Sequence, residues 1–515
     1  MIPFGSFTWF GLLLYAIIPT ILLGLIPQFH RWSRHWLLLV TAGVLTLEFS
    51  SHLAIRPNWE IREIWIVLGY ALFQSLLATA LLRWKSLLPF PLALTLSLLP
   101  LLVAKLLPDF SPDSAFGFLG ISYLTFRALD VLFSIHDGVI KTLPLPQYFA
   151  FLLFFPTASS GPIDRYRRFI QDWAKVRSQD EFLADLDFCI SRIFRGFFYK
   201  FIIAALIHAH WLTPIAKIAG IPAWIGLMYA ETFYLFFDFA GYSAFAIGIS
   251  RLLGIHTPEN FRAPFLSQNI REFWTRWHIS LSFWFRDHVH MRFLLAAMRG
   301  RWFTGKHTAN YLGLFLTFVL MGLWHGFELR YLVYGIYHAT LLCAFDLFSR
   351  WNKQAQLWKT TRPAQVTSIV LTFHSFAFGI MIFNGYLTPR VPPLRENLIE
   401  SCDAQVLTGV VWDRTQPNAT PLVDIYVDGA WVDEVIPNEF REDLRERGLG
   451  NGHHGLTYHF KPDVQTGRAH SVAARIRGKK SNLDGSPVIV VAPRESTSVT
   501  PPPPELLPEL EPLPE

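Results

Sequence analysis

The chain has 515 residues and a formal net charge of +6, and 52% of its residues are hydrophobic while only 16% are charged. Because soluble domains carry about 25% charged residues, this composition excludes an ordinary soluble enzyme and indicates a chain that lies mostly in a membrane. The basic residues gather in short loops rather than along one long face, which excludes a nucleic-acid groove. Only three cysteines are present, far apart and without a CxxC pair, so neither a zinc knuckle nor a disulfide framework is expected.

Apolar segments of spanning length recur from the N-terminus to residue 389. They predict a polytopic α-helical membrane protein with about 10–12 membrane helices plus re-entrant and interfacial helices. Basic loops alternate with mixed or acidic loops, starting with the basic segment His30–His35. By the positive-inside rule, the chain is a multi-pass protein of the cell (inner or cytoplasmic) membrane with its N-terminus outside.

Two charged residues, Arg127 and Asp130, interrupt the apolar segment 116–135. They are three residues apart, share one face of a helix and are predicted to form an intramembrane ion pair. The next apolar segment, Gln147–Ser160, is too short to span a bilayer and is predicted to be re-entrant or interfacial. It leads to a basic cluster around Arg165, which either docks an acidic donor protein or anchors the chain at the lipid surface.

Two acids lie in the long apolar segment 221–249. Glu231 and Asp238 are seven residues apart, which places them on one stripe of a helix. At membrane depth such acids usually face a cavity or a partner. The following stretch, residues 251–291, is too polar to span and too aromatic for a solvated loop, so interfacial helices are expected. It holds four candidate site residues: Asn269, Trp274, Arg276 and His278.

A histidine, His325, follows the apolar run Tyr311–Met321 in the segment Gly322–Gly326. A titratable ring at membrane depth is costly unless it lines a polar cavity or serves a function. A neutral imidazole can take the proton of a hydroxyl as a general base, for ~10²–10⁴-fold in rate. The alternative is a structural histidine that forms a hydrogen bond between helices.

No metal motif is present in the chain. There is no HExxH sequence. His288 and His290 are two residues apart, so they do not share a helical face. No metal site is therefore predicted.

After Pro389 the composition changes to short β-branched or alternating runs with turn signals such as Asp428-Gly429. Residues 400–492 are predicted to form a small, mainly β accessory domain, after a membrane domain of residues 1–390. Residues 493–515 are rich in proline and glutamate and are predicted to be a disordered tail. Four aromatic residues are candidates either for stacking on a sugar or for the core of the β domain: Trp412, Tyr426, Trp431 and Tyr458.

Five motifs occur in a fixed order along the chain. They are Phe155–Arg165, Asp238–Ser243, Asn260–Phe265, Phe273–His278 and Gly322–Gly326. This ordered set resembles the membrane-bound O-acyltransferases (the MBOAT family) over about residues 5–390. Within the family, the chain is similar to the DltB-like and alginate-O-acetylation-like bacterial branch. The resemblance implies the MBOAT fold, whereas the extra β domain departs from the family pattern and leaves the donor and acceptor open.

The resemblance also implies a reaction. An O-acyltransferase of this kind moves an acetyl or D-alanyl-type acyl group from a cytoplasmic thioester donor to a hydroxyl of an exported cell-surface glycopolymer or exopolysaccharide. The family's tunnel histidine matches His325, as general base, and its second histidine matches His278, for which shaping the tunnel is the alternative role. No serine or cysteine has an evident paired base, so direct transfer without an acyl-enzyme is expected. No cofactor is bound permanently, and the donor is a phosphopantetheine thioester on an acyl carrier protein or acyl-CoA.

Further residues are expected to line the substrate tunnel or to dock the donor: Asp238, Asn269, Trp274, Arg276, Ser160 and Arg165. The expected partners are the donor on the cytoplasmic side, membrane lipids, the acceptor polymer and a co-encoded periplasmic or extracellular acyl-transfer partner, with no nucleic acid. Cellulose or a similar exopolysaccharide is the favoured acceptor, ahead of a teichoic-type polymer. Alternatives from other classes are a transporter or flippase, and an inactive scaffold subunit of a polysaccharide export complex.

Overall fold

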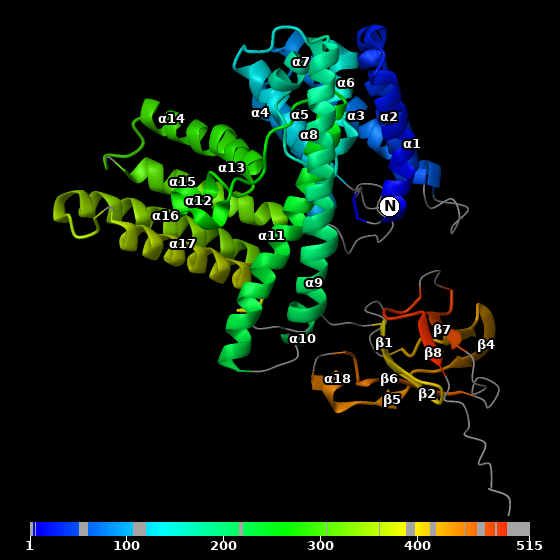
Figure 1. The fold of residues 1–515 in the computed structure, drawn as a ribbon. Helices are drawn as coiled ribbons and strands as arrows, with labels where there is room; N and C mark the ends of the chain where they lie inside the picture. Colours follow the sequence, from blue (N-terminus) through cyan, green and yellow to red (C-terminus); the bar gives the residue numbers. More distant parts are fainter. Residues whose placement is uncertain are drawn as a thin grey trace, which may run out of the picture. The chain divides into compact units, whose positions relative to one another are not determined.

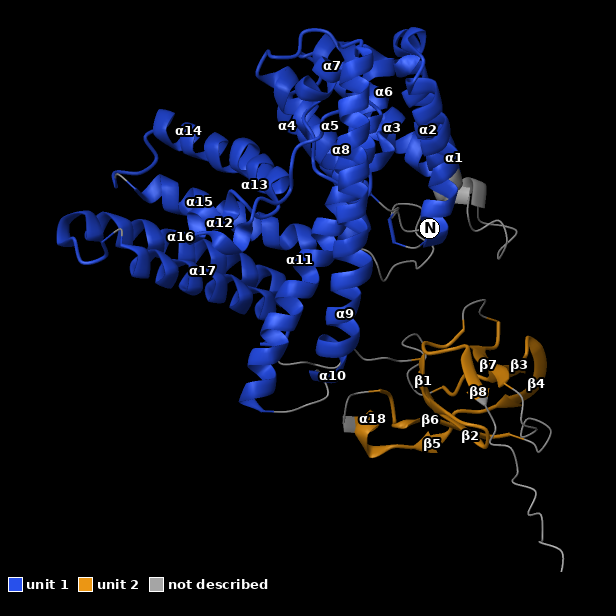
Figure 2. Ribbon diagram, viewed as in Figure 1, with its two compact units in different colours: residues 1–388 blue, residues 389–515 orange. Residues whose placement is uncertain are grey.

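A computed structural model of the chain divides into two compact units, residues 1–388 and 389–515 (Figure 2). Each unit has its own hydrophobic core. The residues that the structure describes are 4–5, 7–50, 60–106, 120–215, 220–305, 307–359, 361–387, 397–412, 419–446, 449–460, 469–478 and 482–491. The tail predicted to be disordered, residues 493–515, lies outside them.

The first unit is helical throughout its described residues (Figure 1). Its α-helices are α1 (Phe7–Gly24), α2 (Ser33–Ser50), α3 (Glu60–Arg83), α4 (Phe90–Leu106), α5 (Ile121–His136), α6 (Leu145–Leu153), α7 (Tyr166–Ala174), α8 (Gln179–Phe197), α9 (Ala205–Ile207), α10 (Thr213–Ile215), α11 (Ile221–Leu252), α12 (Ile270–Trp274), α13 (Ile279–Phe285), α14 (Met291–Arg299), α15 (Thr308–His325), α16 (Leu329–Ala355) and α17 (Arg362–Phe383). Short 3₁₀ segments are η1 (Pro27–Trp32), η2 (Phe155–Thr157) and η5 (Pro264–Leu266), and π-helical segments are η3 (Phe198–Ala204), η4 (His208–Leu212) and η6 (Arg286–His290).

Five of the described helices are long and apolar enough to cross a membrane: α1, α3, α11, α16 and α17. This confirms the predicted polytopic helical membrane protein. The other apolar segments of the sequence correspond to helices that are shorter, such as α4, or that carry buried charges, such as α5. The segment predicted to be too short to span contains α6, which has nine residues.

Arg127 does not pair with Asp130, contrary to the expectation from their spacing. Its side chain is 1% exposed, and its guanidinium donates to the carbonyl oxygens of Phe151 (2.9 Å), Leu152 (2.8 Å) and Thr157 (2.5 Å). The last carbonyls of a helix have no partner within that helix, and Arg127 satisfies those of α6. The spacing shows only which residues share a helix face, whereas the partner of Arg127 comes from a segment more than twenty residues away.

A continuous helical path runs from α8 through η3, α9 and η4 to α10. It begins with a capping box, in which the Ser178 hydroxyl accepts from the Glu181 amide (3.2 Å) and the Glu181 carboxylate accepts from the Ser178 amide (2.9 Å). α11 packs along this path (Figure 1). A Cβ atom at Gly241 of α11 would lie 2.8 Å from the Lys200 Cβ, so only glycine permits this approach.

α15 and α16 form a tight helical hairpin. A Cβ atom at Gly322 would lie 2.2 Å from the carbonyl oxygen of Tyr331, and one at Gly335 would lie 2.4 Å from that of Phe318. The two backbones therefore touch where two glycines face the opposite helix. α17 packs against α16 on its other side. The hairpin places His325, the last residue of α15, between these helices.

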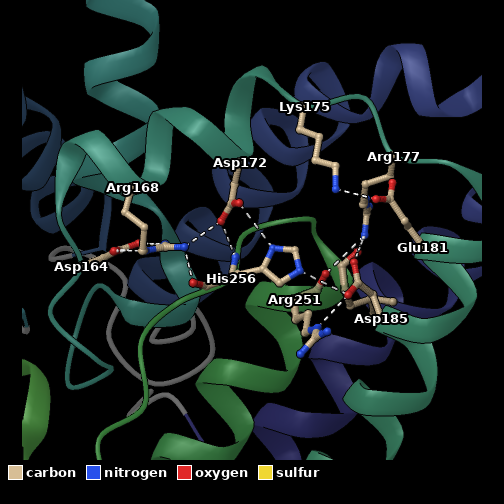
Figure 3. A network of polar contacts seen from close by, with 10 residues as sticks. Asp164, Arg168, Asp172, Lys175, Arg177, Glu181, Asp185, Arg251 and His256 are labelled. Carbon is tan, nitrogen blue, oxygen red and sulfur yellow. Dashed lines mark hydrogen bonds and ion pairs between the residues drawn. The ribbon is translucent and has the colours of Figure 1, made fainter.

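A polar network joins α7 and α8 to the loop that follows α11, and His256 lies at its centre (Figure 3). The imidazole lies between two carboxylates, with Nδ1 3.5 Å from Asp172 and Nε2 3.4 Å from Asp185. The His256 amide also donates to Asp172 (2.7 Å). On the far side of Asp185, Arg251 donates to the same carboxylate at 2.7 Å and Arg177 donates at 3.3 Å. These contacts join the neighbouring helices α7 and α8 to a loop that lies far from them in the sequence.

The second unit contains two four-stranded antiparallel sheets, in the orders β1-β2-β6-β5 and β4-β3-β7-β8. This agrees with the predicted mainly β domain. Its core is formed by aliphatic side chains of both sheets, including Leu407, Val423, Ile425, Leu456 and Val472. The elements are β1 (Asn397–Cys402), β2 (Val406–Val411), β3 (Val423–Val427), β4 (Ala430–Val435), β5 (Glu439–Phe440), α18 (Glu442–Glu446), β6 (His453–His459), β7 (Ala469–Ile476) and β8 (Val488–Val491).

The network predicts a pH-dependent stability. Hydrogen bonds to Asp172 and then Asp185 raise the pKa of His256 from 6.5 to about 9. Because the folded state favours protonated His256, its contribution to the free energy of unfolding is complete below pH 6.5 and is lost as the pH rises through about 9. We expect the melting temperature of the detergent-solubilised protein, followed by tryptophan fluorescence, to fall between pH 7 and 10, and the fall to shrink in the His256→Gln variant.

His35 provides the matched control, because it is exposed and lies outside the network. The His35→Gln variant should keep the pH dependence of the wild type. An equal fall in melting temperature for wild type and His256→Gln would show that His256 is not the group responsible for the pH dependence.

Candidate functional site

A small cavity lies among α11, α12, α13, α15, α16 and α17, and both His278 and His325 line it. Its volume is about 80 Å³. The remaining lining residues are almost all apolar or aromatic: Leu235, Phe239, Trp274, Trp277, Leu281, Met321, Tyr334, Ile380 and Phe383. The structure thus brings together two histidines that are 47 residues apart in the sequence. We call this cavity the histidine chamber.

His325 reaches the histidine chamber from the C-terminal end of α15. Its ring packs edge-on against Phe383 with centroids 4.8 Å apart, and it lies 5.9 Å from the ring of Tyr331. Its backbone carbonyl, one of the free carbonyls at the helix end, accepts from the Lys105 ammonium of α4 at 3.4 Å. The ring makes no hydrogen bond to any other described side chain, so its nitrogens are available to a substrate.

His278 enters the chamber from a loop that is held in a strand-like pairing. Residues Phe261 and Trp277 form an antiparallel bridge, and the amide of Ile279 donates to the carbonyl of Asn260 (3.0 Å). His278 itself has φ 42° and ψ 52°, a left-handed conformation that is uncommon for a residue other than glycine. Its side chain is 6% exposed, and its ring lies 4.8 Å from that of Phe239.

Several polar atoms around the chamber are buried without a partner. They include Nδ1 of His278, Nε1 of Trp274 and both ring nitrogens of His338. A buried polar group without a hydrogen bond costs about 1–3 kcal/mol, and such groups are rare in folded proteins. His278 and Trp274 line the chamber, but these nitrogens are themselves buried and do not face its open space.

Two residues at the chamber, one in its lining and one next to the lining, were not predicted from the sequence. Tyr334 of α16 lines the chamber, and His338, one turn further on, is completely buried against the rings of Trp274 (5.1 Å) and Tyr334 (4.5 Å). His338 carries the signal that marked His325, an imidazole within an apolar run. Tyr334 carries none, because one tyrosine in an aromatic-rich helix does not stand out.

The other predicted site residues of the polar stretch lie at different places. Trp274 lines the chamber. Asn269 caps α12 by accepting from the Glu272 amide (2.9 Å), and it borders a separate apolar cavity of about 410 Å³ among α12, α16 and α17. Arg276 pairs with Glu272 at 2.5 Å. Asn269 and Arg276 therefore hold the short helix that carries Trp274, rather than lining the chamber.

Three predicted residues on other elements also lie outside the chamber lining. Asp238 of α11 forms an ion pair with Lys200. Arg165 donates to Asp130 at 2.8 Å and to Asp287 at 3.0 Å, so its guanidinium joins α5 to the segment η6. Ser160 is partly buried in the loop between η2 and α7.

Histidines elsewhere in the first unit do not form a metal cluster. His288 pairs with Asp130 (3.0 Å) and stacks on Phe133 with centroids 4.6 Å apart. Throughout the described residues, no group of three or more His, Cys, Asp or Glu side chains is placed to hold a metal ion.

Comparison with known protein families identifies the first unit. The model of MBOAT, the membrane-bound O-acyltransferase family, matches residues 25–388, which is most of the chain. The match ends where the first unit ends, so the β unit lies outside it.

The similar proteins carry names of two activities. "Teichoic acid D-alanyltransferase" of Bacillus subtilis is 39% identical over 396 residues, which cover 75% of this chain and 98% of the relative. The protein of the same name from Streptococcus thermophilus is 35% identical over 408 residues, covering 75% and 95%. "Probable alginate O-acetylase AlgI" of Pseudomonas aeruginosa is 31% identical over 334 residues, covering 61% and 58%. These matches confirm the resemblance inferred from the motifs: the chain belongs to the membrane-bound O-acyltransferase family and is an O-acyltransferase.

Proposed function

We propose that this protein moves a small acyl group, of acetyl or D-alanyl type, from a cytoplasmic thioester to a hydroxyl of an exported cell-surface glycopolymer or exopolysaccharide. The observation that carries the proposal is the histidine chamber, a cavity of about 80 Å³ that both His325 and His278 line. The names of the relatives, which refer to teichoic acid and alginate, support a polymeric acceptor.

His325 acts as the general base in this proposal. Its imidazole takes the proton of the acceptor hydroxyl while the oxygen attacks the thioester carbonyl. The tetrahedral intermediate then collapses, the C–S bond breaks, and the proton passes from the imidazolium to the leaving sulfur. The chamber lining contains no serine, threonine or cysteine among the described residues, which supports direct transfer without an acyl-enzyme.

His278 stabilises the negative charge that develops on the carbonyl oxygen. Its ring lines the chamber, and a donor held rigidly beside the reacting atoms is worth far more than one in solution. Its left-handed backbone and the Phe261–Trp277 bridge fix the ring in place. The almost entirely apolar walls offer water few hydrogen-bond partners, which helps to protect the thioester from hydrolysis.

The size of the chamber supports a short acyl group. Its volume of about 80 Å³ exceeds the roughly 10–15 Å³ that a single water needs, and it suits an acyl group as short as acetyl or alanyl. The donor is a phosphopantetheine thioester, on an acyl carrier protein or as acyl-CoA, that arrives from the cytoplasm as a substrate. The acceptor arrives from the other side, directly or through a co-encoded acyl-transfer partner.

The basic loops support the proposed placement in the cell (inner or cytoplasmic) membrane, with the N-terminus outside. The last basic residues before the final span, Arg350, Lys353, Lys359 and Arg362, lie at the end of α16, in the connection and at the start of α17, which puts this connection in the cytoplasm. Because a single spanning helix follows, the β unit then lies on the exported side of the membrane. An exported β unit is available to an exported acceptor.

The central prediction concerns His325. The His325→Ala variant should lose polymer acylation by about 10²–10⁴-fold, because the general base is removed, while it still folds and inserts. The measurement is the acetate or D-alanine released by mild alkali from the cell-surface polymer of expressing cells, with protein abundance in membranes measured in parallel.

His374 offers a matched control, since it is a histidine of α17 that is exposed and does not line the chamber. The His374→Ala variant should acylate at close to the wild-type level. Persistence of acylation in His325→Ala would refute the proposed mechanism.

A second prediction separates the chemical role of the His278 imidazole from the structural role of the His278 backbone. Asparagine tolerates the left-handed conformation, so His278→Asn removes the imidazole without added backbone strain. We expect the rate of acyl transfer to fall on the order of 10²-fold, with an unchanged melting temperature. An active His278→Asn variant, or one whose loss of activity only parallels a loss of folded protein, would mean that the ring merely shapes the chamber.

A further inference from the structure

The two sheets of the β unit bury some of its aromatic residues and expose others. Trp412 and Tyr458 are 9% and 8% exposed and belong to hydrophobic clusters. Trp431 of β4 is 55% exposed, and Tyr426 of β3 is directly paired with it across the two strands. Side chains of directly paired residues point to the same face of a sheet. Because Val423, Ile425 and Val427 of β3 are the buried ones, Trp431 and Tyr426 lie together on the outer face of the β4-β3-β7-β8 sheet.

This outer face carries an apolar row that crosses the strands. Tyr426 pairs on its other side with Ala473 of β7, whose small side chain keeps the surface beside the rings flat. Ser471 lies on β7 two residues before Ala473. It pairs with Ile489 of β8, which is 73% exposed. The row from β4 to β7 spans two strand spacings, about 10 Å. It is an open platform rather than an enclosed pocket.

A bulge in β4 places a polar row on the same face of the sheet as this apolar row. The register shifts between Ile425 and Tyr426, so that Trp431 and Glu434 point to one face although they are three residues apart. Glu434 pairs across the sheet with Asp424, and Asp424 pairs with Arg475 of β7. The polar row therefore runs parallel to the apolar row.

Side-chain contacts hold both rows in place. The indole Nε1 of Trp431 donates to the carboxylate of Asp424 (3.4 Å), and the Arg477 guanidinium donates to the same carboxylate (2.7 Å) and also pairs with Glu434. Arg475 lies over the ring of Tyr426 at 5.0 Å and donates to Asn482 (3.0 Å). A ring that is both exposed and oriented loses little conformational entropy when a ligand binds.

We infer that this face binds a neutral, hydroxyl-rich glycan chain, which under the proposed function is the acceptor polymer. The apolar C–H faces of sugar rings stack on Trp431, and the hydroxyl groups at the ring edges bond to the carboxylates and guanidinium groups of the polar row. Among the residues that the structure describes, the face carries two carboxylates and two guanidinium groups, so these offer no excess positive charge to a polyanion such as a poly(glycerol phosphate) or a polyuronate. Charge balance thus selects a neutral acceptor.

The test uses the purified full-length protein in detergent. Binding is measured by retardation in native gels that contain one of three neutral polysaccharides, namely hydroxyethyl cellulose, dextran or galactomannan, or one of two polyanions, alginate or poly(glycerol phosphate). We expect at least one neutral polysaccharide to retard the wild type and neither polyanion to do so. The Trp431→Ala variant should bind about tenfold more weakly, and Trp431→Phe, which keeps a ring, should retain most of the binding.

Phe440 gives a matched control, because it is 47% exposed on β5 of the other sheet. The Phe440→Ala variant should bind like the wild type. Retardation by the polyanions, no retardation by any neutral polysaccharide, or undiminished binding in Trp431→Ala would each overturn the inference.

The same experiment separates this inference from the proposed reaction. The His325→Ala variant should still be retarded like the wild type, because His325 is not part of the β unit. If Trp431→Ala lost binding while His325→Ala retained acylation activity, the glycan site would stand and the proposed mechanism would fall. If instead Trp431→Ala kept binding while His325→Ala lost acylation activity, the glycan site would be refuted and the proposed mechanism would stand.

Discussion

The contact between the backbones of α15 and α16 is the constraint on which the chamber depends. At Gly322 and Gly335 there is no room for a Cβ atom, because each would lie within 2.4 Å of a carbonyl oxygen of the opposite helix. The hairpin closes only with glycine at these positions, and its closure brings His325 and Tyr334 to the same wall. Gly322 and His325 therefore act together in this motif, because the close helix contact at the glycine sets the position of the histidine.

Buried polar groups explain much of the rest of the membrane unit. Arg127 and Asp130 are both buried, and each is held by a distant segment: carbonyl oxygens at the end of α6 bind the Arg127 guanidinium, and Arg165 with His288 binds Asp130. Some buried nitrogens have no partner among the described residues, both away from the chamber, as at Nε of Arg127 and Nδ1 of His288, and beside it, at His278 and Trp274. The contacts that are made join segments that lie far apart in the sequence.

The β unit adds a separate surface to the acyltransferase. The family match ends before it, and it has its own core. Its outer face combines an oriented indole with balanced charges, a combination suited to sugars rather than to polyanions. A glycan held on this surface would raise the local concentration of acceptor hydroxyls without any change to the chamber. The chemistry and the choice of polymer would then reside in different parts of the chain.

Local patterns determined the membrane class, the division near Pro389 and the mainly β unit, and they made His325 a candidate, because hydrophobic length and a polar residue within an apolar run can be recognised in a single segment. Only the tertiary structure decided that Arg127 caps α6 instead of pairing with Asp130, that His338 packs against Trp274, and that Trp431 rather than Trp412 is exposed. Each of these depends on a partner from a distant segment or on the register of a strand. Spacing along one helix or strand tells which residues share a face, but it contains no information about what that face meets.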